Sequence, residues 1–328
     1  MNLVIRHLFR DLGDFYVTNF FQTLYNKIQL RFPEHSFDIQ NDSSYEDNGY
    51  GSIYSCMHLS ILNPNNQKYL VVSFFDNWRY LFMKHLGWSP QLMTQMFYCG
   101  GFNYLEYFYW KKYNQNNSDV YLPLDIEHKY YSFFYGPYNI NHENIETELY
   151  DSRKIQDTIP NLYFRGYLWD FRRGLVDGLD IPDSLILDKN LEDNNLNYNE
   201  YLRDLSQYRA ALSLPGGTEM CNRDIECFSI GVPVIRPLLT VNYPDPLLPN
   251  YHYIPCYDTY KYYEGYPVVL NSKAFQESLN DCWNRVKYNE EYLNFISNNA
   301  RKWYTKNCTL SCNTDYVLST INLEMLYG

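Results

Sequence analysis

The sequence has little basic charge and lacks the common patterns of a bound metal. Its 328 residues include 27 Lys and Arg against 38 Asp and Glu, so the formal net charge at pH 7 is −11. A protein that binds nucleic acid needs a positive surface to displace counterions from the phosphates. The eight cysteines are scattered, with no Cys-x-x-Cys and no Cys/His grouping at zinc spacing. We therefore expect no nucleic-acid partner, no metal and no other cofactor.

Long apolar runs are missing as well. No stretch approaches the about 18 uncharged apolar residues that a membrane-spanning helix requires. The N-terminal segment carries Arg6, Arg10 and Asp11 where a signal peptide has an uninterrupted apolar core. We expect a soluble protein of the cytoplasm or another intracellular compartment, without a signal peptide and with reduced cysteines.

Aromatic residues are abundant instead. Tyr (36 residues), Phe (19) and Trp (6) together make up 19% of the chain. Disordered chains are poor in such large apolar side chains, so this composition excludes a disordered protein. The length allows about two domains of ordinary size, each with a substantial core.

The order of predicted elements in the second half indicates an α/β fold. We expect strands over 161–166, 184–188, 210–217 and 232–237, and helices over 170–179, 199–208, 218–231, 272–286 and 290–306. This alternation predicts a parallel sheet with helices on both faces. Ligands of such sheets bind at the carboxyl ends of the strands.

The first half mixes the two kinds of element less regularly. We expect a helix over 15–28, strands over 68–76, 119–125 and 130–136, and helices within 90–110. A polar, charged segment at 137–160 is the predicted linker. We therefore place an N-terminal domain at 1–152 and a C-terminal domain at 153–310. A last helix within 311–328 can pack back on the N-terminal domain.

Arginines gather at the end of one predicted strand and the start of the next helix. Arg165 lies at the strand end, and Arg172 and Arg173 follow in the helix. Guanidinium groups suit bidentate contact with phosphate, and a helix N-terminus adds partial positive charge. The same arginines could instead pair with nearby acids such as Asp170 and Asp177.

A second strand end combines glycines with a charged helix face. Gly216 and Gly217 let backbone amides approach an anion closely, and the helix that follows begins at the same place. Its Arg223 and Glu226 are spaced i, i+3, which fits a surface ion pair worth a few tenths of a kcal/mol. It is equally possible that Arg223 binds a phosphate and that Glu226 accepts hydrogen bonds from a ribose.

The span 208–237 resembles the donor-binding region of GT-B fold glycosyltransferases and is most similar to the exostosin-like group. The shared pattern is a strand, a Pro-Gly loop, Arg223-x-x-Glu226, and then Gly231-x-Pro233-Val234-Ile235. The group's aromatic-Arg-Gly strand end, with an Arg in the next helix, is similar to Phe164-Arg165-Gly166 with Arg172 or Arg173. Asn299-Ala300-Arg301 also suits the C-terminal helices of this fold, so the resemblance covers roughly 160–306.

The resemblance implies two Rossmann-like domains that face each other across a cleft, and an activity. It implies transfer of a sugar from a nucleotide-diphosphate donor to a hydroxyl group of a glycan, glycoprotein or other acceptor. Many retaining members carry Glu-x7-Glu; here the second Glu falls at Glu226 and the first position is Thr218, with Glu219 one residue out of step. This departure favours the exostosin-like pattern, and that resemblance in turn implies an inverting reaction. The implied donor-binding residues are Arg165, Gly166, Arg172, Arg173, Gly216, Gly217, Thr218, Asn222, Arg223 and Glu226.

An inverting transfer also needs a base, which we expect in the N-terminal domain. Asp76 is the first candidate, because it ends the predicted strand 68–76, and Asp125 is the alternative. Either could simply cap a turn or a helix. Because the sequence has no Asp-x-Asp to hold a nucleotide-bound metal, we expect a metal-independent reaction. The aromatic segment 96–105 could stack on sugar rings or fill the core.

Two other functions fit the same sequence features. A nucleotide-sugar epimerase or a phosphorylase of the same architecture would use a similar donor site. A non-catalytic carbohydrate-binding or scaffold protein would retain the fold without the reaction. Binding of nucleoside diphosphates separates the last of these from the enzymes only in part, and turnover separates them fully.

Overall fold

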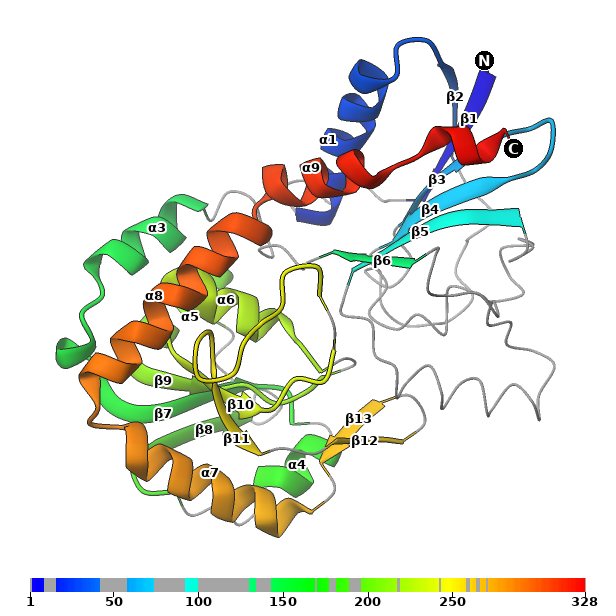
Figure 1. The fold of residues 1–328 in the computed structure, drawn as a ribbon. Coiled ribbons are helices and arrows are strands. Elements are labelled where there is room, and N and C mark those ends of the chain that lie inside the picture. Colours follow the sequence, from blue (N-terminus) through cyan, green and yellow to red (C-terminus); the bar gives the residue numbers. More distant parts are fainter. Residues whose placement is uncertain are drawn as a thin grey trace. The chain divides into compact units, whose positions relative to one another are not determined.

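The structure is a computed structural model that describes residues 2–8, 16–41, 58–73, 92–99, 130–133, 143–168, 170–176, 181–188, 196–216, 219–241, 243–257, 260–263, 266–269 and 271–327. The chain divides into two compact units, each with its own sheet (Figure 1). Unit 1 comprises Met1–Ile140, Val241–Pro244 and Leu310–Gly328, and unit 2 comprises Asn141–Thr240 and Asp245–Thr309. The predicted α/β class is confirmed in both.

Unit 1 contains a six-stranded mixed sheet with the order β2-β1-β3-β4-β5-β6. Its elements are β1 (Asn2–Leu8), α1 (Tyr16–Arg31), β2 (Ser36–Asn41), β3 (His58–Leu62), β4 (Tyr69–Ser73), β5 (Met93–Cys99), β6 (Tyr130–Phe133), α9 (Leu310–Thr320) and the 3-10 turn η8 (Leu323–Leu326). Strand β3 runs antiparallel to both of its neighbours, and the other pairs are parallel.

Helix α1 confirms the helix expected over 15–28. Its Phe20, Leu24 and Ile28 repeat every four residues and are fully buried, which places one apolar stripe of the helix in the core. The C-terminal segment shares that core through Val317 and Leu326. Unit 1 is thus completed by residues from near both ends of the sequence.

Strand β5 corrects the helices expected within 90–110. In its segment Met93, Thr94, Gln95 and Phe97 are all buried, as in a strand that is covered on both faces. The Gln95 side chain is satisfied there, because its Oε1 accepts from the backbone N–H of Asn322 at 2.7 Å and its Nε2 donates to the carbonyl of Thr320 at 3.0 Å. The aromatic residues of this segment therefore predicted burial correctly, but they predicted helices where the described residues form a strand.

Unit 2 contains a five-stranded, fully parallel sheet with the order β11-β10-β9-β7-β8. Its elements are α3 (Glu143–Ser152), η7 (Ile155–Asp157), β7 (Ile159–Gly166), α4 (Asp170–Val176), β8 (Ser184–Asp188), α5 (Tyr198–Ser206), β9 (Tyr208–Leu212), α6 (Asn222–Ile230), β10 (Val234–Pro237), β11 (Ile254–Tyr257), the hairpin β12 (Tyr260–Tyr263) and β13 (Tyr266–Val269), α7 (Ser272–Val286) and α8 (Glu290–Asn307).

Helices cover both faces of the unit 2 sheet. Figure 1 shows α4 and α7 on one face and α5, α6 and α8 on the other. Phe164 and Ala210 from the strands pack with Phe275, Leu279 and Trp283 of α7 in the main cluster. The predicted alternation of strands and helices in this half is confirmed. The segment 137–160, which we expected to be a linker, contains α3 and η7.

Two arginines hold the amino-terminal edge of this sheet. Arg153 donates to the backbone carbonyls of Ser206, Tyr208, Arg209 and Gly231. Arg209 donates to the carbonyls of 155, 158 and 287. Both side chains thus satisfy carbonyl groups where chain segments enter β9 and β10, and these contacts leave the opposite, carboxyl edge to other residues.

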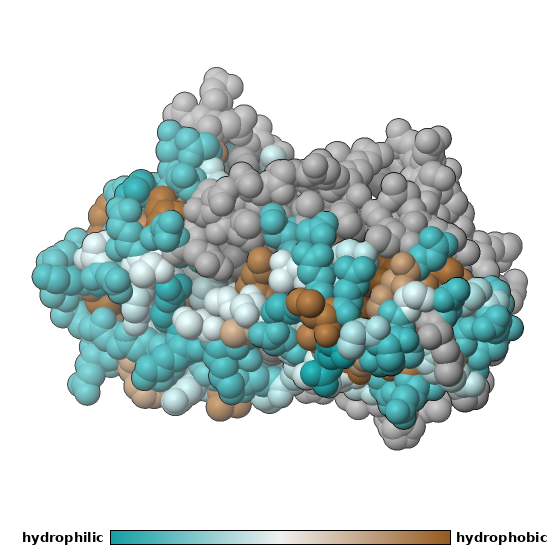
Figure 2. Space-filling model, turned by 90° about the horizontal axis from the view of Figure 1, so that it is seen from above, coloured by the Kyte–Doolittle hydropathy of each residue, from teal (hydrophilic) through white to brown (hydrophobic). Residues whose placement is uncertain are grey.

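The face drawn in Figure 2 is mainly hydrophilic where its residues are described. Figure 2 shows one side of the molecule, where hydrophilic residues cover most of the described area and apolar residues form separate patches. Scattered apolar side chains are ordinary on a globular protein. Within the described residues, no helix has the length and apolar character needed to cross a membrane.

The C-terminal segment supplies a test of the unit 1 core. Leu326 is fully buried, whereas its neighbour Met325 is 37% exposed. We expect Leu326→Ala to lower the free energy of unfolding by about 2–5 kcal/mol, because it leaves a cavity among packed side chains. Met325→Ala should change it by less than about 0.5 kcal/mol. Urea denaturation measures both; equal effects would contradict a core role for this segment.

Candidate functional site

The candidate site lies at the carboxyl edge of the unit 2 sheet. Strands β7 and β9 are parallel neighbours, so Gly166 and Leu212 end at the same edge. From Leu212 the chain continues through a buried segment, 213–216, and then reaches the N-terminus of α6. The two motifs that the sequence singled out therefore meet in space. This is the edge at which parallel α/β sheets bind ligands.

Arg223 in the first turn of α6 joins the two motifs directly. Its Nη2 donates to the backbone carbonyl of Arg165. Its guanidinium carbon lies 4.2 Å from the centre of the Phe164 ring, within the range of a cation–π contact. A Cβ atom on Gly166 would lie 2.6 Å from the same Nη2. Phe164, Arg165 and Gly166 thus form a seat for the Arg223 side chain.

The Nε of Arg223 is a hydrogen-bond donor that this seat does not use. The residue is only 9% exposed, and its buried Nε has no hydrogen-bond partner among the residues that the structure describes. Buried donors are rarely left unpaired, because losing a hydrogen bond to water costs about 1–3 kcal/mol. Arg223 is therefore a buried cation with remaining capacity to donate at the carboxyl edge.

Glu226 and Tyr201 complete the polar cluster. The Tyr201 hydroxyl donates to Oε2 of Glu226 at 3.0 Å. Burial raises the pKa of Glu226, while the positive charge of Arg223 and the Tyr201 hydrogen bond act against that rise. Burial acts to lower the pKa of Arg223, but Tyr201, Cys221 and Glu226 outweigh it, so that pKa is raised. Arg223 is thus charged at every physiological pH.

The burial of Arg223 argues against an exposed surface ion pair with Glu226. Glu226 is only partly exposed; it accepts a hydrogen bond from Tyr201, and the charge of Arg223 also acts on its carboxylate. Asn222, by contrast, is exposed at the first position of α6. The side chains of Arg223 and Glu226 therefore face the end of β7 and α5, whereas Asn222 is exposed.

Arg172 of α4 contacts the backbone of the loop between β9 and α6. It donates to the carbonyls of Pro215 at 2.7 Å, Tyr167 at 3.1 Å and Leu214 at 3.1 Å. A Cβ on Gly216 would lie 2.9 Å from its Nη2. Burial lowers the pKa of Arg172. Its observed contacts brace this loop, and Gly216 permits their close approach.

The two remaining arginines contact carboxylates. Nη2 of Arg173 lies 2.6 Å from Oδ2 of Asp188, the last residue of β8. Nη1 of Arg165 lies 3.5 Å from Oδ2 of Asp204 on α5, which also accepts from the Tyr163 hydroxyl. The acidic partners that the structure shows are thus different from those suggested by sequence proximity.

Four candidates lie outside the described residues: Gly217, Thr218, Asp76 and Asp125. The predicted strand 119–125 and residues 100–105 of the aromatic segment do as well. Among the residues that are described, no three His, Cys, Asp or Glu side chains are grouped so that they could hold a metal ion.

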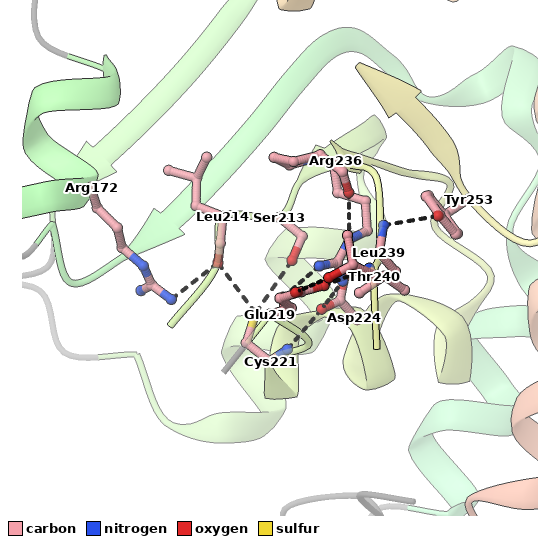
Figure 3. A network of polar contacts seen from close by, with 11 residues as sticks. Arg172, Ser213, Leu214, Glu219, Cys221, Asp224, Arg236, Leu239, Thr240 and Tyr253 are labelled. Atoms are coloured by element: carbon pink, nitrogen blue, oxygen red, sulfur yellow. Dashed lines mark hydrogen bonds and ion pairs between the residues drawn. The ribbon is translucent and has the colours of Figure 1, made fainter. Parts of the chain in front are cut away.

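A buried charge network beside the site escaped the sequence analysis (Figure 3). Nη1 of Arg236 lies 2.6 Å from Oδ2 of Asp224, and both side chains are fully buried. Arg236 Nη2 also donates to the carbonyl of Glu219. A charge in the middle of the apolar strand 232–237 was the available signal, because buried charges are nearly always paired. The sequence did not identify the partner.

Gly166 supplies a test of the Arg223 seat. We expect Gly166→Ala to destabilise the protein by about 1–3 kcal/mol, because the new methyl group displaces the guanidinium from the Arg165 carbonyl. Gly174→Ala is the control, since nothing lies within 4 Å of a Cβ there. That change should stabilise α4 by about 0.5–1 kcal/mol. Thermal unfolding compares them, and a Gly166→Ala protein as stable as the control would contradict the seat.

Comparison with known proteins gives a loose similarity to a solved structure. No family model matches this chain, and no curated protein sequence matches it. Among solved structures, a glycosyltransferase from Rickettsia africae ESF-5 is similar over 98% of this chain and 97% of that one, with 11% sequence identity and a TM-score of 0.44. Because this structural similarity is so loose, a functional proposal has to rest on the side chains of the site.

Proposed function

We propose that this protein is a glycosyltransferase that uses a nucleotide-diphosphate sugar. The observation that carries the proposal is the Arg223 seat: a buried guanidinium whose Nε has no partner among the described residues, placed beside a carboxylate at the carboxyl edge of a parallel sheet. Nucleotides bind at this edge in other open α/β sheets. The resemblance of residues 208–237 to GT-B donor sites supports the same assignment.

The cluster offers separate groups for the two halves of the donor. Arg223 and the N-terminus of α6 supply positive charge for the diphosphate. The carboxylate of Glu226 can accept hydrogen bonds from ribose hydroxyl groups. Gly216, where a side chain would collide with Arg172, lets Arg172 brace the loop that leads to α6. Arg172, Arg173 and Arg165 contribute to this site mainly by fixing the loops around it.

We place the acceptor and the catalytic base in unit 1. In an inverting transfer, the base takes the proton of the acceptor hydroxyl, and that oxygen forms a bond to the anomeric carbon. The bond between this carbon and the phosphate oxygen breaks, and its electron pair leaves with the nucleoside diphosphate. Asp76 is the proposed base, with Asp125 as the alternative. Arg223 would counter the charge on the leaving group without a metal.

Nucleotide binding tests the donor site. We expect at least one of the uridine, guanosine and thymidine diphosphates to bind, as measured by calorimetry. Arg223→Ala should weaken binding about 10- to 100-fold, because charge-assisted hydrogen bonds contribute about 1.5–3 kcal/mol. Arg223→Lys, which keeps the charge but loses the fork of donors, should retain part of the affinity.

The control for this test is Arg203→Ala on the adjacent helix α5. Arg203 is exposed and pairs with the exposed Glu148, so its loss should leave binding unchanged. If no diphosphate binds the wild-type protein, or if Arg223→Ala binds as tightly as Arg203→Ala, the donor-site proposal is wrong.

Turnover tests the catalytic base. We expect Asp76→Asn to leave nucleoside-diphosphate affinity within about twofold of wild type but to lower turnover by about 100-fold or more, since general-base catalysis contributes about 10²–10⁴. Release of nucleoside diphosphate from a panel of donors and glycan acceptors measures this, with Asp125→Asn in parallel. Retained turnover in Asp76→Asn removes Asp76 from the mechanism. Binding without turnover in the wild type would favour the non-catalytic carbohydrate-binding alternative.

A further inference from the structure

The network around Arg236 joins two loops at the carboxyl edge. Arg236 lies on β10 and is fully buried. Its Nη2 donates to the carbonyl of Glu219, and its Nε donates to the carbonyl of Pro237 at 3.2 Å. Its Nη1 contacts the Asp224 carboxylate. One guanidinium thus contacts a residue shortly before α6, a residue in its first turn and the last residue of β10.

Glu219 makes a second connection between the same two loops. Its Oε2 accepts from the backbone N–H of Thr240 at 2.6 Å, and its Oε1 accepts from the Thr240 hydroxyl. The carboxylate is therefore directed toward the segment after β10. This differs from a direct role of Glu219 in donor binding, which a one-residue shift of Glu-x7-Glu would have required.

Asp224 links this network to the start of α6. Its Oδ2, the same atom that contacts Arg236, accepts from the backbone N–H of Cys221 at 2.8 Å. On the other side of the loop, Cys221 Sγ lies 3.3 Å from Ser213 Oγ, and Arg172 holds Leu214. Figure 3 shows Ser213, Leu214, Glu219 and Cys221 together with the residues that they contact.

Stability alone explains such a network poorly. Removing charges from water is costly, and replacing a buried ion pair by well-packed apolar side chains is often neutral or stabilising. What the charged pair provides instead is a fixed geometry. Arg223 adjoins Asp224 in the chain, so the anchor that holds Asp224 also fixes where the Arg223 side chain leaves α6.

We propose that Arg236, Asp224, Glu219 and Thr240 form a clasp that positions the start of α6 for donor binding. Arg236 and Thr240 are positioning residues: they act through the segment 219–223 and need no contact with the nucleotide. The clasp holds Arg223 on its Phe164 seat before the diphosphate arrives. This inference rests on the proposed function, because it assigns the clasp to the same donor site.

Matched pairs of variants test the clasp. Arg236→Lys and Thr240→Val weaken it, while Arg153→Lys and Thr158→Val make the same changes at the amino-terminal edge. Arg153 donates to four backbone carbonyls there, and the Thr158 hydroxyl donates to the carbonyl of Ile155. Each control thus perturbs unit 2 without touching the carboxyl edge. Circular dichroism establishes that the variants are folded.

Two measurements on these proteins report whether the start of α6 is correctly positioned, rather than how stable the protein is. Calorimetry with the tightest-binding nucleoside diphosphate should show affinity lowered about tenfold or more in Arg236→Lys, because a misplaced binding group loses most of its effect. Thr240→Val should show a smaller loss in the same direction, and both controls should stay within about twofold of wild type. Hydrogen exchange of amides 219–223 should accelerate in the clasp variants only, as expected for local opening.

The outcomes separate the clasp from the proposed function. Clasp variants that bind and exchange like the wild type overturn the proposal. So does an equal loss of affinity in Arg153→Lys, since it would indicate general destabilisation. If the wild type binds no nucleoside diphosphate, the donor site is wrong, and the role of the clasp in donor binding falls with it. Exchange at 219–223 then decides only whether the clasp orders this loop.

Discussion

The site depends on the contact between one buried guanidinium and the end of one strand. Arg223 lies against the Phe164 ring and donates to the Arg165 carbonyl, and Gly166 leaves space for it. Each partner comes from β7, whereas Arg223 comes from α6, more than fifty residues later. The cation–π contact and the hydrogen bond hold the charge at the sheet edge, where the Glu226 carboxylate also acts on it. Its Nε has no partner among the described residues and remains able to donate to an anion.

The sequence singled out Arg165, Arg172, Arg173 and Arg223 as candidate anion ligands, whereas the structure divides the arginines of unit 2 by partner. Arg153, Arg172 and Arg236 donate to backbone carbonyls at the ends of strands and loops. Arg173 faces the carboxylate of Asp188. These side chains give unit 2 its loop geometry, and Arg223 differs from them because its Nε has no partner in the described part of the chain.

Much of unit 2 could be predicted from the sequence, because its periodic strands and helices alternate without interruption. The contacts of the site could not, since they depend on which distant groups meet. Arg236 signalled a buried charge, but nothing local shows that Asp224 is its partner or that Glu219 contacts Thr240. The error at β5 has the same origin: Gln95 is buried in a strand because the C-terminal segment satisfies its amide.

The shared core of unit 1 has a consequence for synthesis. Leu3 and Leu70 pack in the same cluster as Val317 and Leu326, so residues up to 326 must leave the ribosome before that cluster can close. Unit 2 draws its main core only from residues 155–296 and can close earlier. The usual N-to-C order of domain folding is then reversed. The apolar strands of unit 1 stay unpacked until the segment with Val317 and Leu326 has been synthesised, so they are the part of the nascent chain most in need of a chaperone.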